Sequence, residues 1–327
     1  MALLIVVIAI PSGGLPGLSG AMPRDAANLK LPEGSEAIVE HIYSWQIDRA
    51  IQEAREMQRQ FPEHPLGYLL EAEAEWWRIW CAAMEFRYGM NLPRHRPKKE
   101  SDQAYLDVVN KAAAVAAASL KRQETAEMQL YAGTADAQMA RMYGLRSEAR
   151  NTARAGVSAR AHLQRALALD PTLADACLGL GLYDYYIDTL STAARMLRFV
   201  MGIPGGSKTE GIRLMQRAIN EGELTPAAAR FDLAINLYKY DQRYEDALAV
   251  ITPLAERFPG NPIFQLARGD LYAKLGRKQQ AIEAYQAAAA GNSGDEQCRK
   301  KIEQLVRESL AAMNGTAISQ GHSSGLR

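Results

Sequence analysis

The chain has 327 residues, which is enough for two ordinary domains or for one elongated array of repeats. Its 38 Lys and Arg residues balance 37 Asp and Glu residues, so no overall field draws it to nucleic acid, and a nucleic-acid partner is not expected. Aromatic residues are sparse and alanine recurs in runs such as residues 112–118, a composition that favours packed helices over sheets. We expect an all-α protein.

The N-terminal segment, residues 1–21, has the pattern of a signal peptide. Residues 2–10 form an apolar run that is too short to span a bilayer, and residues 19–21 are small, as a signal peptidase requires. We expect residues 1–21 to direct export to the periplasm and residues 22–34 to form a linker. No basic residue precedes the apolar run, so a cytoplasmic protein that retains this segment is the alternative.

Residues 35–170 have helical apolar spacing. Ile38, Ile42 and Trp45 are separated by four and three positions, and residues 105–120 continue in the same way, which gives each segment one apolar face. Proline-containing breaks at 61–65 and 92–97 separate the segments. We expect degenerate helix pairs in this region.

Three cysteines, Cys81, Cys177 and Cys298, lie far apart within helical patterns, and none belongs to a C-x-x-C motif. Their odd number argues against a disulfide framework. We therefore expect three buried thiols that act as small core residues.

A repeated unit is visible toward the C-terminus. Tyr238 recurs as Tyr272, and Ala247 recurs as Ala281 at the same separation. A related unit is suggested earlier, because the Phe-Pro pair at 61–62 recurs at 258–259. The separation of the two tyrosines matches the tetratricopeptide period of about 34 positions.

When the last unit is started at Pro262, small and aromatic residues fall at the packing positions of that repeat. They are Gly269, Tyr272, Gly276, Ala281, Tyr285 and Ala288. Small residues let the second helix approach the first, and aromatic rings fill the space between them. On these residues the chain is identified as a tetratricopeptide repeat protein, which implies a TPR-like α-solenoid of antiparallel helix pairs whose concave face binds proteins or peptides.

An earlier unit begins at Ala174, but its second-helix residues, Gly211, Met215 and Ala218, come late. We expect an inserted helix at 189–201 and a Gly-Pro loop to fill the delay. Residues 179–186 together with 202–206 resemble a group of exported bacterial tetratricopeptide proteins and, more distantly, the tetratricopeptide protein 39 family, a likeness that covers residues 170–290.

The expected organisation follows from these boundaries. After the linker, residues 35–170 form a degenerate helical-repeat region and residues 171–313 form a tetratricopeptide region with an insertion at 187–206. Residues 314–327, rich in Ser and Gly, are expected to form a disordered tail.

The stretch 202–209 is one glycine short of a phosphate-binding loop. Ser207 stands in place of the second glycine of G-x-x-x-x-G-K-[ST], and a helical pattern rather than a strand precedes Gly202. Residues 203–206 instead suit a type II turn with positive φ at Gly205. Ser207 and Glu210 suit a capping box at the start of the next helix. An enzyme built on residues 187–211 is the third alternative.

Other candidate chemistry lacks partners. The G-x-S-x-G match at 321–325 lies in the tail, and the five histidines have no metal-binding spacing. We expect no catalytic residue, no metal site and no cofactor. Arg146, Arg150 and Arg154 recur every four positions and are expected to form a solvated basic ridge.

In stacked repeats, fixed positions of each first helix line the concave face. The matching residues are the predicted ligand groove: Asp175, Leu178, Leu182, Tyr185, Tyr186, Asp232, Asn236, Lys239, Tyr240, Leu266, Asp270 and Lys274. Tyrosine among mixed polar residues suits peptide recognition. The carboxylate clamp of some family members is not reproduced, because Asp232 stands where a lysine is required and Ala267 where an asparagine is required.

We therefore expect a non-catalytic scaffold or assembly factor that binds a protein or peptide through this groove. The alternative is a membrane-associated or small-molecule-binding helical protein that uses the tryptophan cluster of Trp76, Trp77 and Trp80.

Overall fold

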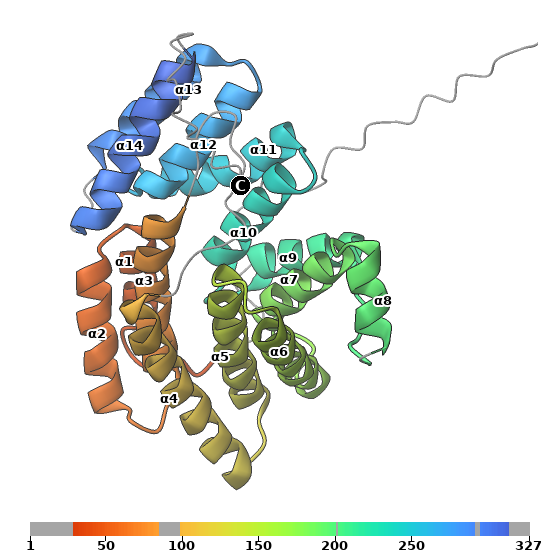
Figure 1. Ribbon diagram of the computed structural model, residues 1–327. Helices are drawn as coiled ribbons and strands as arrows, with labels where there is room; N and C mark the ends of the chain where they lie inside the picture. The colour runs from red at the N-terminus through yellow and green to blue at the C-terminus, as the bar shows by residue number, and fades with distance from the viewer. Residues whose placement is uncertain (1–28, 85–98, 201, 292–294, 314–327) are drawn as a thin grey trace, which may run out of the picture.

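The computed structural model describes residues 29–84, 99–200, 202–291 and 295–313, and within these ranges the chain forms helices and no strand (Figure 1). The helices are α1 Ser35–Tyr43, α2 Ile47–Gln60, α3 Leu66–Ala83, α4 Glu100–Arg122, α5 Ala126–Leu145, α6 Ala149–Leu169, α7 Ala176–Asp188, α8 Thr192–Val200, α9 Lys208–Glu221, α10 Pro226–Lys239, α11 Tyr244–Arg257, α12 Pro262–Lys274, α13 Lys278–Ala290 and α14 Glu296–Met313. The all-α prediction is confirmed. The predicted signal peptide at 1–21 and the tail at 314–327 lie outside the described residues.

The helices pack as consecutive pairs, α1 with α2, α3 with α4, α5 with α6, α7 with α9, α10 with α11 and α12 with α13, and α14 follows the last pair. The glycine at the eighth position of the last repeat explains one such contact. A Cβ added to Gly269 in α12 would lie 2.7 Å from the ring of Tyr285 in α13, so the large residue occupies the space that the small one leaves. The packing inferred from the sequence is confirmed for this pair.

A shared backbone feature marks the turn between the two helices of four pairs. Trp45, Ser147, Gln242 and Gly276 all have positive φ, between 54° and 73°. The next residue then donates its backbone N–H to the preceding helix, as Gln46 does to His41 (2.8 Å) and Arg277 to Tyr272 (2.9 Å). The same turn thus recurs in α1/α2 and α5/α6, where the sequence matches the repeat only weakly.

The inserted helix is present as α8, between α7 and α9. The pair that it interrupts still packs at close range, because Gly181 and Gly211 face each other: a Cβ on Gly211 would lie 2.6 Å from the carbonyl oxygen of Gly181. Met215 and Ala218 of α9 are fully buried, as the late second-helix signature predicts.

The two ends of the helical array meet (Figure 1). α3 packs against α14, and a disulfide joins Cys81 to Cys298 across 217 residues of sequence. The Asn261 side chain donates to the Tyr43 carbonyl (2.9 Å), which ties α1 to the start of α12. The prediction of three free thiols is therefore wrong for this pair and holds for Cys177, which is buried and unpaired. An odd cysteine count carries no information about which distant helices come together.

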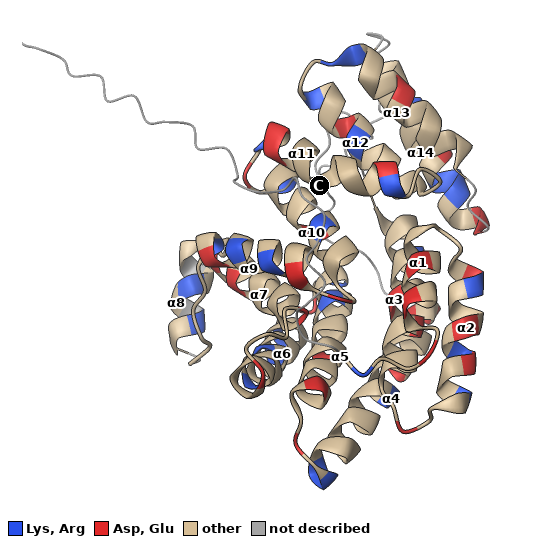
Figure 2. Cartoon of the chain, turned by 180° about the vertical axis from the view of Figure 1, so that it is seen from behind, with Lys and Arg blue, Asp and Glu red and all other residues tan. Residues whose placement is uncertain are grey.

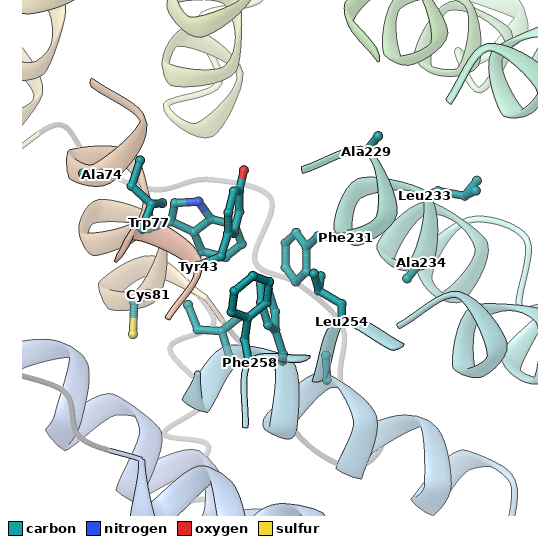
Figure 3. Close-up of a cluster of buried hydrophobic side chains, with 14 of the residues drawn as sticks. Tyr43, Ala74, Trp77, Cys81, Ala229, Phe231, Leu233, Ala234, Leu254 and Phe258 are labelled. Carbon is teal, nitrogen blue, oxygen red and sulfur yellow. The ribbon is translucent and has the colours of Figure 1, made fainter. Parts of the chain in front are cut away.

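Aromatic side chains fill the space where the ends meet (Figure 3). Trp77 lies at the centre, with ring centroids 4.9 Å from Phe231 of α10, 5.6 Å from Phe264 of α12 and 5.8 Å from Tyr43 of α1. Its indole N–H donates to Glu73 (3.0 Å), which satisfies the one polar atom of the ring. We call Tyr43, Trp77, Phe231 and Phe264 the closure cluster.

Two local predictions are wrong. Gly202, at φ 66°, takes the left-handed conformation expected at Gly205, so the chain reverses directly after α8 rather than at the proline. Arg146 is buried and binds Asp102 through two hydrogen bonds (2.7 and 2.6 Å), so it does not belong to a solvated basic ridge. An ion pair within the core satisfies a guanidinium that periodicity alone places on the surface.

The contact between α7 and α9 can be tested with Gly211→Ala. Alanine is favoured over glycine inside a helix by about 1 kcal/mol, so helix propensity alone predicts a more stable protein. The clash with Gly181 should instead lower the free energy of unfolding by about 1–3 kcal/mol, measured by urea denaturation. Gly260→Ala is the control, because a Cβ there meets no atom within 4 Å. A stabilised Gly211→Ala variant would contradict the observed packing.

Candidate partner-binding surface

Five of the predicted groove residues are buried, and two of them, Tyr185 and Asn236, lie beneath the open part of the groove on α7 and α10. Leu266 is fully buried, and Asp175 and Asp270 are 4% and 1% exposed. Asp175 accepts hydrogen bonds from the backbone N–H groups of Glu223, Leu224 and Thr225 (2.9–3.1 Å) and so fixes the chain that enters α10. These residues hold neighbouring repeats together and present no open surface to a partner.

Asp270 lies between α10 and α13. It accepts hydrogen bonds from the hydroxyl groups of Tyr238 and Tyr285. Burial raises the pKa of its carboxyl to about 6. Its role is to satisfy two tyrosine hydroxyls within the repeat core.

Asp232 of α10 faces the N-terminal helices. Burial raises the pKa of its carboxyl to about 7, the nearby Glu73 adds to the increase, and Arg141 of α5 opposes it. Arg141 binds Glu73 (2.7 Å) and lies over the ring of Trp76 (4.5 Å). The first helices of the early pairs therefore cover this part of the predicted groove.

An open part of the groove remains on α7 and α10. Tyr186 and Tyr240 are 42% and 41% exposed, and each of their rings lies about 6 Å from the ring of buried Tyr185. Lys239 places its ammonium 4.8 Å from the Tyr240 ring. We call Tyr185, Tyr186, Lys239, Tyr240 and the adjoining Asn236 the tyrosine patch.

Asn236 anchors this patch from below. Its side-chain oxygen accepts from the Tyr186 hydroxyl (3.1 Å), and its backbone oxygen accepts from the Tyr185 hydroxyl (3.0 Å). Burial of the hydroxyl end raises the pKa of Tyr186, although the ring itself remains exposed. The Asn236 amide nitrogen is buried and has no hydrogen-bond partner among the described residues, so the patch holds an unused donor beneath an exposed ring.

The other predicted groove residues, Leu178, Leu182 and Lys274, are half-buried. The structure thus brings Tyr185, Tyr186, Asn236, Lys239 and Tyr240 together and leaves Lys274 on a later repeat. Their prediction as ligand contacts stays a prediction. No feature of the local sequence pattern predicts that α3 and α5 face Asp232.

The residues after α8 hold local structure together. Ser207 accepts from the Glu210 N–H (3.4 Å), as predicted, whereas the Glu210 carboxylate accepts from Arg213 (2.6 and 2.8 Å) instead of turning back to Ser207. The Lys208 ammonium pairs with Asp241 (2.5 Å). A helix rather than a strand precedes this loop, and its lysine is held by a carboxylate of the next repeat.

The tryptophan cluster belongs mainly to the interior. Trp77 is 3% exposed and Trp76 and Trp80 are half-buried, with Trp80 lying 5.4 Å from Phe231. A pocket of 290 Å³ lies nearby between Trp45, Arg78 and Asp295. Within the described ranges, no group of His, Cys, Asp or Glu is arranged to hold a metal ion, and no helix is long and apolar enough to cross a membrane.

Residues 232–296 match the family model described as tetratricopeptide repeat, and this range runs from the middle of α10 to the first residue of α14. None of the curated proteins compared with the chain matches it. The family match falls on the same helices in which the repeat period is clearest.

Three solved structures are loosely similar to the chain. The C-terminal part of a TPR repeat-containing protein from Cytophaga hutchinsonii is 13% identical, with 87% of this chain and 89% of that chain covered and a TM-score of 0.41. The Cut9–Hcn1 hetero-tetramer of the APC/C is 11% identical (83% and 48% covered, TM-score 0.33). The complex of the TPR2AB domain of yeast Sti1 with pHSP90 is 13% identical (85% and 98% covered, TM-score 0.29). The solenoid fold is therefore inferred from the way this chain's own helices pair.

The Asp232 carboxyl predicts a pH-dependent stability. Its pKa is higher in the folded protein than in the unfolded chain, so the folded state holds the proton more tightly, and stability falls as pH rises from about 4 to about 7. Asp232→Asn should remove this part of the pH dependence and raise the free energy of unfolding at pH 8 by about 1–2 kcal/mol. Urea denaturation between pH 4 and pH 8 measures it, with Asp107→Asn on the exposed side of α4 as the control. An unchanged slope in the Asp232 variant would contradict the assignment.

Proposed function

From the tetratricopeptide repeats at residues 232–296 as the premise, we propose that this chain is a non-catalytic scaffold that binds a protein or peptide partner at the tyrosine patch. The observation that carries the proposal is the contrast along the predicted groove. Tyr186 and Tyr240 are open, whereas Leu266 and Asp270 are buried and Asp232 faces the protein's own helices.

The chemistry of the patch suits a peptide. Exposed tyrosine rings provide a large apolar contact with few rotatable bonds, and such residues commonly dominate binding energy at interfaces. Lys239 adds a positive charge at the edge of the patch, beside the Tyr240 ring. A short segment of a partner fits a patch that spans only α7 and α10.

The burial of Trp77 disfavours the alternative function that relies on the tryptophan cluster. A membrane or ligand contact through Trp77 would require the closure cluster to open, because its ring packs on Phe231 and Phe264. The tyrosine patch needs no such rearrangement.

The tyrosine patch is tested by in vivo photo-crosslinking and by substitution. A photo-crosslinking residue in place of Tyr240 should capture a discrete partner, and one in place of Phe61, which is similarly exposed on the α2–α3 turn, should not. Tyr186→Ala combined with Tyr240→Ala should weaken binding of that purified partner about 10- to 100-fold, because interface tyrosines of this kind contribute about 2 kcal/mol or more. Equal capture at both positions, or unchanged affinity, would count against the proposal.

We also propose that the protein acts outside the cytoplasm, in the periplasm. The Cys81–Cys298 disulfide supports this, because such bonds persist in oxidising compartments and are rare in the cytosol. It agrees with the signal-peptide pattern at residues 1–21.

The compartment is tested by thiol trapping. Protein made with residues 1–21 should be alkylated, after acid quenching and denaturation, at Cys177 alone, and protein made without residues 1–21 should be alkylated at all three cysteines. Mass spectrometry counts the adducts. Three free thiols in both preparations would contradict export.

A further inference from the structure

α8 carries the most exposed large apolar side chains of the described residues. Met196, Phe199 and Val200 are 68%, 83% and 81% exposed, whereas the other exposed large apolar side chains of the described residues are 37–42% exposed. Phe199 and Val200 come three and four positions after Met196, so all three lie toward one side of the helix. This short helix thus carries a concentrated apolar surface that faces solvent.

α8 is held by its own flanking chain. Ser191 caps it by accepting from the Ala194 N–H (3.3 Å), and Arg198 donates to the Ile203 carbonyl (2.9 Å). No other helix of the described part packs extensively against it, and it projects from the edge of the molecule in both views (Figures 1 and 2). Burial in the core therefore does not account for Met196, Phe199 and Val200.

α8 itself carries positive charge and no negative charge. No acidic residue occurs between Asp188 and Glu210, and α8 itself carries Arg195 and Arg198 (Figure 2). Arg160 of α6 adds a third guanidinium near the loop after α8: it lies 5.4 Å from the ring of Tyr183, whose hydroxyl donates to the Pro204 carbonyl (2.9 Å). The exposed apolar face is thus flanked by positive charge.

We propose that α8 docks the protein on an anionic membrane surface, with Phe199, Val200 and Met196 inserted among the acyl chains and Arg195 and Arg198 at the level of the lipid phosphates. A short basic amphipathic helix binds in this way, through buried apolar area together with attraction to anionic headgroups. The hydrogen bonds of Arg195 to the Leu190 carbonyl (3.0 Å) and of Arg198 to the Ile203 carbonyl hold both charges beside the apolar face. A helix that projects from the molecule can lie directly on a flat bilayer. A protein partner would instead need a groove with a wall on each side of the helix.

This surface is distinct from the tyrosine patch, so the two proposals can fail separately. Vesicle flotation with the full chain provides the test, using vesicles of equal parts phosphatidylglycerol and phosphatidylcholine and vesicles of phosphatidylcholine alone. We expect binding to the anionic vesicles that weakens as salt is raised from about 0.05 to about 0.3 M, because the phosphate attraction is screened.

Phe199→Ser combined with Val200→Ser should weaken that binding roughly tenfold or more, because two apolar side chains leave the bilayer. Arg195→Gln combined with Arg198→Gln should remove the preference for anionic vesicles. Phe61→Ser is the matched control, because Phe61 is an exposed phenylalanine directly after α2. This variant should bind as the wild type does, and so should Tyr240→Ala. Circular dichroism checks that each variant is folded.

Three results would overturn the proposal: equal binding of the wild type to neutral and anionic vesicles, unchanged binding by the Phe199 and Val200 double variant, or no binding by the folded wild type. If the last result is accompanied by a soluble acidic protein crosslinked through position 199, α8 enters a protein groove instead.

Discussion

The packing of Trp77 against Phe231 and Phe264 is the constraint on which the rest of the structure depends. It brings helices from the two ends of an elongated array into one core and turns a row of helix pairs into a closed arrangement. The Cys81–Cys298 disulfide fixes that closure covalently. Removal of several aromatic rings from water gives a large apolar gain at a junction that no local helix pairing requires.

Closure changes what a tetratricopeptide surface can do. An open solenoid offers its whole inner face to a partner, but here α1, α3 and α5 occupy much of that space. Asp232 is half-buried and faces Glu73 and Arg141, and Asp270 further along binds Tyr238. The tyrosine patch on α7 and α10 is what remains open, and the inserted α8 adds a second exposed surface next to it in sequence. Both surfaces lie on or beside the one repeat whose two helices are interrupted.

Buried carboxyls illustrate how the same residue type can serve different purposes in one fold. Asp175 organises a backbone turn, Asp270 accepts hydrogen bonds from two tyrosine hydroxyls, and Asp232 has a carboxyl pKa that burial raises and that the nearby Glu73 raises further. All three occupy repeat positions that line a groove in an open array. Position in the repeat therefore assigns a direction to a side chain but does not establish that solvent or a partner can reach it.

The sequence by itself determined the helices, the tetratricopeptide period, the inserted helix and the Ser207 cap, because each depends on residues a few turns apart along the chain. It also placed Gly269 against Tyr285 and Gly211 within the late second helix. Only the tertiary structure decided that Cys81 meets Cys298, that Arg146 is buried with Asp102, and that Leu266 is closed while Tyr240 is open. The physical reason is that small rotations between successive helix pairs add up along a solenoid, so the meeting of its ends is a property of the whole array and of no single segment.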